Sequence, residues 1–196
     1  MNARLERTAG AALAALLVVH VVLRPEHGWV LLWGCDASAA AIAIGLLAGA
    51  PRLFAAGAVF QIAIGAPAFL VGLATTYVPN VTGVGVHTLP PIIGGLVIAR
   101  RGLPGWPAIA AAAGYLGLLC ASYLFAPVAE NVNFVRAVFP PLAPLFSSLP
   151  GFWLFHVTAA SIVLLLGQAL LRRLVRRAGA ASSEPPPAPL PPPDSA

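Results

Sequence analysis

Residues 151–171, GFWLFHVTAASIVLLLGQALL, form an apolar run without a charged side chain, and the next six residues, RRLVRR, carry four arginines. A helix that crosses a bilayer needs about 20 such residues, at a rise of about 1.5 Å per residue. Arginines directly after an apolar run are typical of the cytoplasmic end of a membrane span. This stretch therefore predicts a transmembrane helix, and the rest of the chain repeats its pattern.

The composition of the 196-residue chain also indicates a lipid environment. Hydrophobic residues make up 59% and charged residues 9%, whereas soluble domains carry about 25% charged residues. So few charges cannot cover the surface of a soluble domain. The net charge of +5 comes from arginines near apolar segments, a distribution that indicates a membrane surface and not nucleic acid.

The apolar stretches predict the architecture. We expect spans at approximately 8–23, 29–49, 53–76, 86–99, 107–126 and 151–171. They should be helices, because lipid-exposed backbone must satisfy its own hydrogen bonds. The fourth stretch is short, so a re-entrant segment remains an alternative there. The prediction is an all-α polytopic bundle of about six transmembrane helices over residues 1–177, followed by a disordered Pro-rich cytoplasmic tail over residues 178–196.

The arginines predict the orientation of this bundle. Six spans place Arg24 and Arg136 on one side and the other nine of the eleven basic residues on the opposite side. Cytoplasmic loops carry such an excess, so both termini should be cytoplasmic. Alanine-rich, lysine-free usage indicates a bacterial chain and hence the inner membrane.

Polar side chains gather in the outer half of the predicted bundle. Asp36 lies seven residues into its span, and an aspartate at the centre of a membrane helix costs at least about 2.5–3.5 kcal/mol. We expect Asp36 to face the interior with His87 or His156 as its partner. Its role is either a polar pocket that opens to the outside or a structural hydrogen bond between helices. For His20, alone on an apolar helix, we favour a structural role.

The outer connection over residues 127–150 carries Glu130, Asn131 and Asn133. Two asparagines two positions apart would project alike, and could hold a headgroup or cap a helix end. Together with His156, these three are the predicted substrate-binding residues. Several prolines prevent one long helix here, so the segment is either a lid over a polar pocket or an ordinary interfacial loop.

A nucleophile and a base are also present at similar depth. Cys35 lies beside Asp36, with Ser38 one turn further, and His87 opens the fourth span. A thiol or hydroxyl nucleophile needs such a base within hydrogen-bond reach. His87, Cys35 and Asp36 are therefore the candidate catalytic residues. No HExxH or HxxxH spacing, P-loop or GxGxxG after a strand is present, so we expect neither a metal nor another cofactor.

Two resemblances extend these hypotheses. The stretch Val86-His87-Thr88-Leu89-Pro90-Pro91, followed by apolar residues and Arg100-Arg101, resembles the H-T-x-x-P-type segment of the androgen-induced family of intramembrane lipid hydrolases. That resemblance implies His87 as the base and Cys35 as the nucleophile, where the family mostly uses threonine. Residues 29–171 resemble more closely a group of uncharacterised bacterial multi-pass membrane proteins, which share an early Asp (Asp36), a mid-chain His (His87) and a Glu-Asn-x-Asn loop (130–133).

Two classes of function follow. One is an intramembrane hydrolase or acyltransferase that acts on a lipid. The other is a non-catalytic protein that binds or moves a lipid or a small molecule, with Asp36 and His87 as a ligand site or proton relay. The expected partners are the lipid bilayer and a lipid substrate or ligand; nucleic acid is not expected, and the sequence does not define an oligomeric state.

Overall fold

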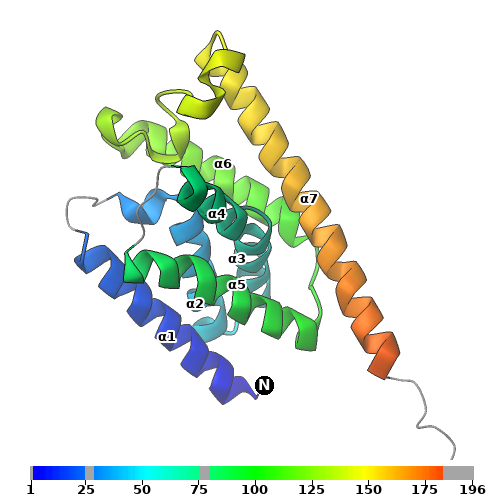
Figure 1. Cartoon of the computed structure of the whole chain (residues 1–196). Helices are drawn as coiled ribbons and strands as arrows, with labels where there is room; N and C mark the ends of the chain where they lie inside the picture. The colour runs from blue at the N-terminus through cyan, green and yellow to red at the C-terminus, as the bar shows by residue number, and fades with distance from the viewer. Residues whose placement is uncertain (1, 25–28, 76–79, 183–196) are drawn as a thin grey trace, which may run out of the picture.

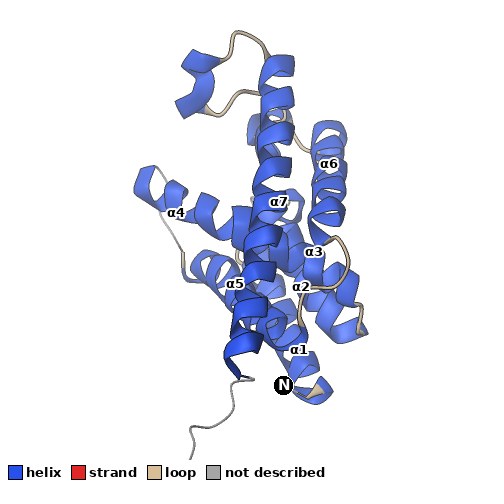
Figure 2. Ribbon diagram, turned by 90° about the vertical axis from the view of Figure 1, so that its right-hand side faces the viewer, coloured by secondary structure: helices blue, strands red, loops and turns tan. Residues whose placement is uncertain are grey.

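The computed structural model describes residues 2–24, 29–75 and 80–182, and these ranges are helical with no strand. This confirms the predicted all-α helix bundle (Figures 1 and 2). Short 3-10 turns, η2 (Val30–Leu32), η4 (Val128–Glu130), η5 (Val132–Phe134) and η6 (Pro140–Leu145), lie in the connections. The α-helices are α1 (Ala3–Val22), α2 (Gly34–Ala48), α3 (Pro51–Phe60), α4 (Ala66–Thr75), α5 (Val81–Arg101), α6 (Pro107–Phe125) and α7 (Leu149–Ser182).

Five of these helical segments are long and apolar enough to cross a membrane. They are α1, the continuous segment Pro51–Thr75, α5, α6 and α7. The shorter apolar helix α2 has 15 residues, or about 22 Å, because the chain before it forms η2. Each predicted stretch thus corresponds to one helical segment, and these helices are compatible with a multi-pass membrane protein.

The fourth predicted span is longer than its hydropathy indicated. Helix α5 runs without interruption for 21 residues and contains Pro90 and Pro91 in its interior. It begins at Val81 because the side chain of Asn80 caps it, accepting a hydrogen bond from the backbone N–H of Gly83 at 2.6 Å. A continuous helix of this length is long enough to cross a membrane.

A π-helical turn, η3 (Gln61–Gly65), joins α3 to α4. It ends two residues before Pro67. A proline ring collides with the carbonyl four residues earlier, here that of Ala63. The wider π turn moves this carbonyl, so the helix continues through the proline.

Helix α2 forms the centre of the bundle, with α1 and α3 packed against it. Its Gly45 is so close to α3 that an added Cβ would lie 2.5 Å from the backbone nitrogen of Phe54. Gly49 ends α2 with a φ of 64°, a conformation that glycine adopts without strain. Gly45 and Gly49 therefore allow the close packing of α2 against α3 and the tight turn between them.

The two ends of the bundle differ in chemistry. We call one the arginine end: it holds the start of α1, the α2–α3 turn, the α5–α6 connection and the C-terminal part of α7. Arg101 forms an ion pair there with the largely buried Glu6. The opposite end, called the polar end, holds His20, Asp36 and the 126–148 connection.

Helix α7 lies along the outside of the bundle and extends beyond it at the arginine end (Figure 1). Its 34 residues span about 51 Å, more than the hydrocarbon core of about 30 Å. The last turns continue to Ser182, so residues 178–182 of the predicted tail are helical. The remaining Pro-rich segment, 183–196, lies outside the described residues.

Candidate functional site at the polar end

The central feature of the polar end is a buried pair of ionisable side chains. Nε2 of His20, in the last turn of α1, lies 3.7 Å from Oδ1 of Asp36, in the first turn of α2, and the two side chains are 2% and 5% exposed. The other ring nitrogen of His20, Nδ1, lies 2.9 Å from Oγ1 of Thr82 in α5. This pair thus joins three helices. It also corrects our expectation that His87 or His156 is the partner of Asp36.

The hydrogen bonds around His20 indicate the tautomer of its neutral form. The hydroxyl of Thr82 donates to Oδ1 of Asn80 at 3.1 Å, so it accepts from His20. The proton of neutral His20 is therefore on Nδ1, and Nε2 faces Asp36. At 3.7 Å, Nε2 and Oδ1 are too far apart for a hydrogen bond, and the contact is an ion pair only when His20 is protonated.

Gln61 is the second buried polar side chain here, and it opens the π-helical turn. Its side-chain nitrogen donates to the carbonyl of Val86 at 3.0 Å and to that of Cys35 at 3.3 Å. These carbonyls immediately precede His87 and Asp36, so Gln61 ties α5 to α2. Within the described ranges, Oε1 of Gln61 and Oδ1 of Asp36 are buried without a hydrogen-bond donor. An unpaired buried acceptor costs about 1–3 kcal/mol, so both oxygens are unsatisfied acceptors in the interior.

His87 is held by its own helix and by α4. Its Nδ1 lies 2.8 Å from the carbonyl of Gly83, and its ring stacks on Phe69 with centroids 4.3 Å apart. Among the described residues it makes no hydrogen bond to Cys35 or Asp36. The hydroxyl of Ser38 donates to the carbonyl of Cys35 at 2.8 Å. The predicted contact between a nucleophile and its base is thus not formed in this structure.

The loop residues have distinct roles. Asn133 is buried, with a φ of 53°, and its Oδ1 accepts from the backbone N–H of Gly34 at 3.0 Å. Its side-chain nitrogen donates to the carbonyl of Leu32 and the hydroxyl of Ser122. Asn133 therefore caps the start of α2, one of the two roles that the sequence suggested. Asn131 instead orders its own loop, by accepting from the backbone of residues 136 and 137. Glu130 is half-buried in η4.

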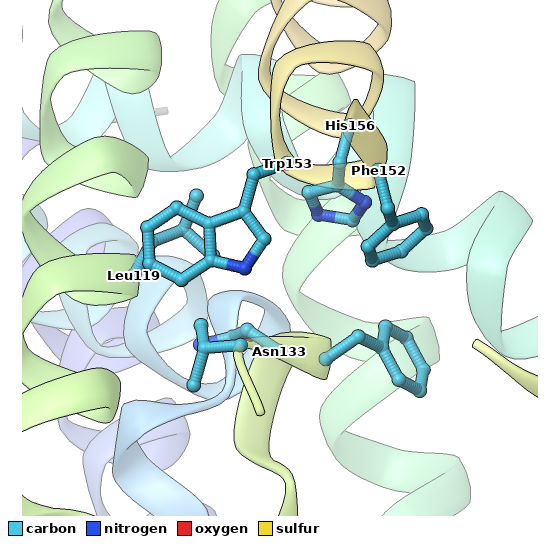
Figure 3. A pocket seen from close by; sticks show the side chains of 7 residues that line it. Leu119, Asn133, Phe152, Trp153 and His156 are labelled. Carbon is cyan, nitrogen blue, oxygen red and sulfur yellow. The ribbon is translucent and has the colours of Figure 1, made fainter. Parts of the chain in front are cut away.

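His156 belongs to a second group of polar side chains. Its Nε2 lies 2.6 Å from the hydroxyl of Tyr115 in α6. Together with Asn133 and Trp153 it lines a narrow pocket of about 170 Å³, in which no water-sized sphere fits (Figure 3). The indole N–H of Trp153 is buried there without an acceptor among the described residues. The structure thus brings His156 and Asn133 together, apart from the His20–Asp36 pair.

Sequence reasoning missed Gln61, Thr82 and Tyr115, and it gave His20 only a structural role. A signal existed for two of them. Gln61 is a lone amide inside an apolar stretch, and His20 occupies the same outer depth as Asp36. Thr82 and Tyr115 are residue types that occur throughout membrane helices, so their partners depend on helix packing.

The chain was compared with known protein families, curated proteins and solved structures. The chain matches no protein-family model, no curated protein and no solved structure. Within residues 2–24, 29–75 and 80–182, no group of three His, Cys, Asp or Glu side chains could hold a metal ion.

Proposed function

We propose that this protein is a non-catalytic membrane protein that binds or moves a small molecule or lipid, and that the His20–Asp36 pair exchanges a proton with that process. The observation that carries the proposal is the 3.7 Å approach of two buried ionisable side chains from different helices. Such groups are costly within a membrane and commonly belong to ligand sites or proton relays.

The charge of the pair suggests how it would work. One proton taken up by the pair would leave it without net charge, either as a neutral carboxyl beside a neutral imidazole or as an ion pair. A ligand that donates hydrogen bonds would find two acceptors, Oδ1 of Asp36 and Oε1 of Gln61. His20 is also joined to Thr82 of α5. Binding of a ligand to Asp36 would therefore change the contacts of both α1 and α5. A polar ligand and a proton would then be linked through the same carboxylate.

The alternative of an intramembrane hydrolase has less support from the geometry. A Cys or Ser nucleophile needs a base within hydrogen-bond reach. In the described part of the chain His87 contacts Gly83 and Phe69, and the Ser38 hydroxyl is used by the backbone of its own helix.

Infrared difference spectroscopy of the purified protein tests the proton-exchange proposal. Lowering the pH should produce a protonated-carboxyl band that is absent from Asp36→Asn and shifted in frequency in His20→Gln. Glu6→Gln, which changes a buried carboxylate at the arginine end, is the matched control and should retain the band. Identical spectra for the wild type and Asp36→Asn over the whole pH range would overturn the proposal.

Labelling with a fluorophosphonate lipid probe tests the enzyme alternative. The non-catalytic proposal requires that the wild type stays unlabelled while a control hydrolase reacts in the same detergent. Labelling that disappears in His87→Ala and in either Cys35→Ala or Ser38→Ala would instead establish a nucleophilic enzyme.

A further inference from the structure

A second hollow lies at the arginine end, at the opposite end of the bundle from the His20–Asp36 pair. It has a volume of about 330 Å³ and is lined by Leu103, Arg172, Val175 and Arg176. Its walls come from α7 and from the connection between α5 and α6. Two apolar side chains and two guanidinium groups thus face the same space.

One of these guanidinium groups is held in place. Arg172 donates to the carbonyl of Gly105 and lies over the ring of Trp106, 4.9 Å from its centroid. Gly105 has a φ of 57°, a conformation that favours glycine, so the turn that presents this carbonyl depends on it. Arg172 therefore enters the hollow in a fixed position with further N–H groups available for an oxyanion.

The second guanidinium group has no protein partner in the described ranges. Arg176 follows Arg172 by four residues, which places both on one face of α7. The chain has six acidic residues, and the one described at this end, Glu6, is paired with Arg101. The positive charge in the hollow is therefore not neutralised by a carboxylate of the described chain.

The surroundings indicate an amphiphilic ligand. Trp106 is 63% exposed, and tryptophan is enriched at the interface between lipid headgroups and acyl chains. The apolar side chains of Leu103 and Val175 line the hollow itself. Basic pockets between membrane helices at this depth bind phospholipid headgroups. We propose that the hollow binds the phosphate group of an anionic phospholipid, with the start of the acyl chains against Leu103, Val175 and Trp106.

Native mass spectrometry of the full chain released from mixed vesicles tests this site. The probes are phosphatidylglycerol and phosphatidylcholine in equal amounts. We expect the wild type to retain phosphatidylglycerol preferentially and Arg176→Gln to retain about tenfold less, the effect of one charge-assisted hydrogen bond. The matched control is Arg173→Gln, which removes the same charge from an exposed arginine that does not line the hollow, and it should behave as the wild type.

Three results would overturn the proposal. An equal loss in Arg173→Gln and Arg176→Gln would show general attraction to the arginines. Displacement of the lipid by excess inorganic phosphate would show a site for a free anion. Equal retention of the two lipids by the wild type would show no headgroup selection. Far-UV circular dichroism confirms that each variant is folded, and Arg172→Lys, which keeps the charge but not the planar fork, should weaken retention without affecting the helices.

Discussion

His20 and Asp36 lie at the ends of two consecutive helices and face each other across 3.7 Å in the buried part of the polar end. The pairing depends on how α1 and α2 pack against each other. An isolated charge in this position would be expensive, whereas a protonated His20 beside an ionised Asp36 would carry no net charge. Each residue therefore lowers the free-energy cost of burying the other.

Removing one member of the pair should destabilise the protein more than removing both. His20→Leu leaves Asp36 buried without its partner, and we expect the free energy of unfolding in detergent to fall by about 3–5 kcal/mol. The double variant His20→Leu/Asp36→Leu should recover most of this loss. Denaturant titration followed by circular dichroism measures both. A double variant as unstable as the sum of the two single variants would contradict the pairing.

The cap provided by Asn133 predicts a local effect. Asn133→Ala removes three hydrogen bonds and leaves the N–H of Gly34 buried without an acceptor, which should cost about 2–3 kcal/mol. The 126–148 connection should then be cleaved faster by an added protease. Ser147→Ala, at an exposed position of the same connection, is the control and should leave the rate unchanged.

The close approach of α2 and α3 leaves no room for a larger side chain at Gly45. Gly45→Ala should lower the free energy of unfolding by about 1–3 kcal/mol, because its Cβ would collide with the backbone of Phe54. Gly117→Ala, in α6 with no atom within 4 Å of an added Cβ, should instead be neutral or stabilise by up to about 1 kcal/mol. Thermal denaturation in one detergent compares the two. Equal effects would mean that the packing of α2 against α3 is looser than described.

The arginine distribution makes a prediction about orientation. In a chain with Cys35→Ala and Cys120→Ala, a membrane-impermeant maleimide added to intact cells should label Ser147→Cys and not Arg173→Cys. The physical reason is the retention of arginine-rich segments on the cytoplasmic side. Permeabilised cells provide the control, since both cysteines should react there. The reverse pattern in intact cells would place the arginine end outside.

The helices were predictable because each apolar stretch is a local property of the chain. The ends of the helices were harder to predict. Helix α5 begins at Val81 because Asn80 caps it, and its first turns contain Gly83 and Gly85, which have low hydropathy. Helix α2 is shorter than its apolar stretch because residues 30–32 form a 3-10 turn.

The partners within the site could not be predicted in the same way. The position of each residue along its predicted span was enough to place four side chains in one half of the bundle: His20, Asp36, His87 and His156. Which of them meet depends on the rotation and order of the helices, and a span of apolar residues carries little information about either. Asp36 therefore has His20 beside it, while His156 lies against Tyr115 of α6.

The cap on α2 also has a consequence for biosynthesis. The bond from Gly34 to Asn133 joins residues 99 positions apart. At a synthesis rate of about 5–20 residues per second, Asn133 leaves the ribosome roughly 5–20 s after Gly34. During that interval the first helices are inserted while the N–H of Gly34 lacks its final acceptor. The cap on α2 can thus form only after the loop that contains Asn133 has been synthesised, which follows the synthesis of five of the six apolar segments.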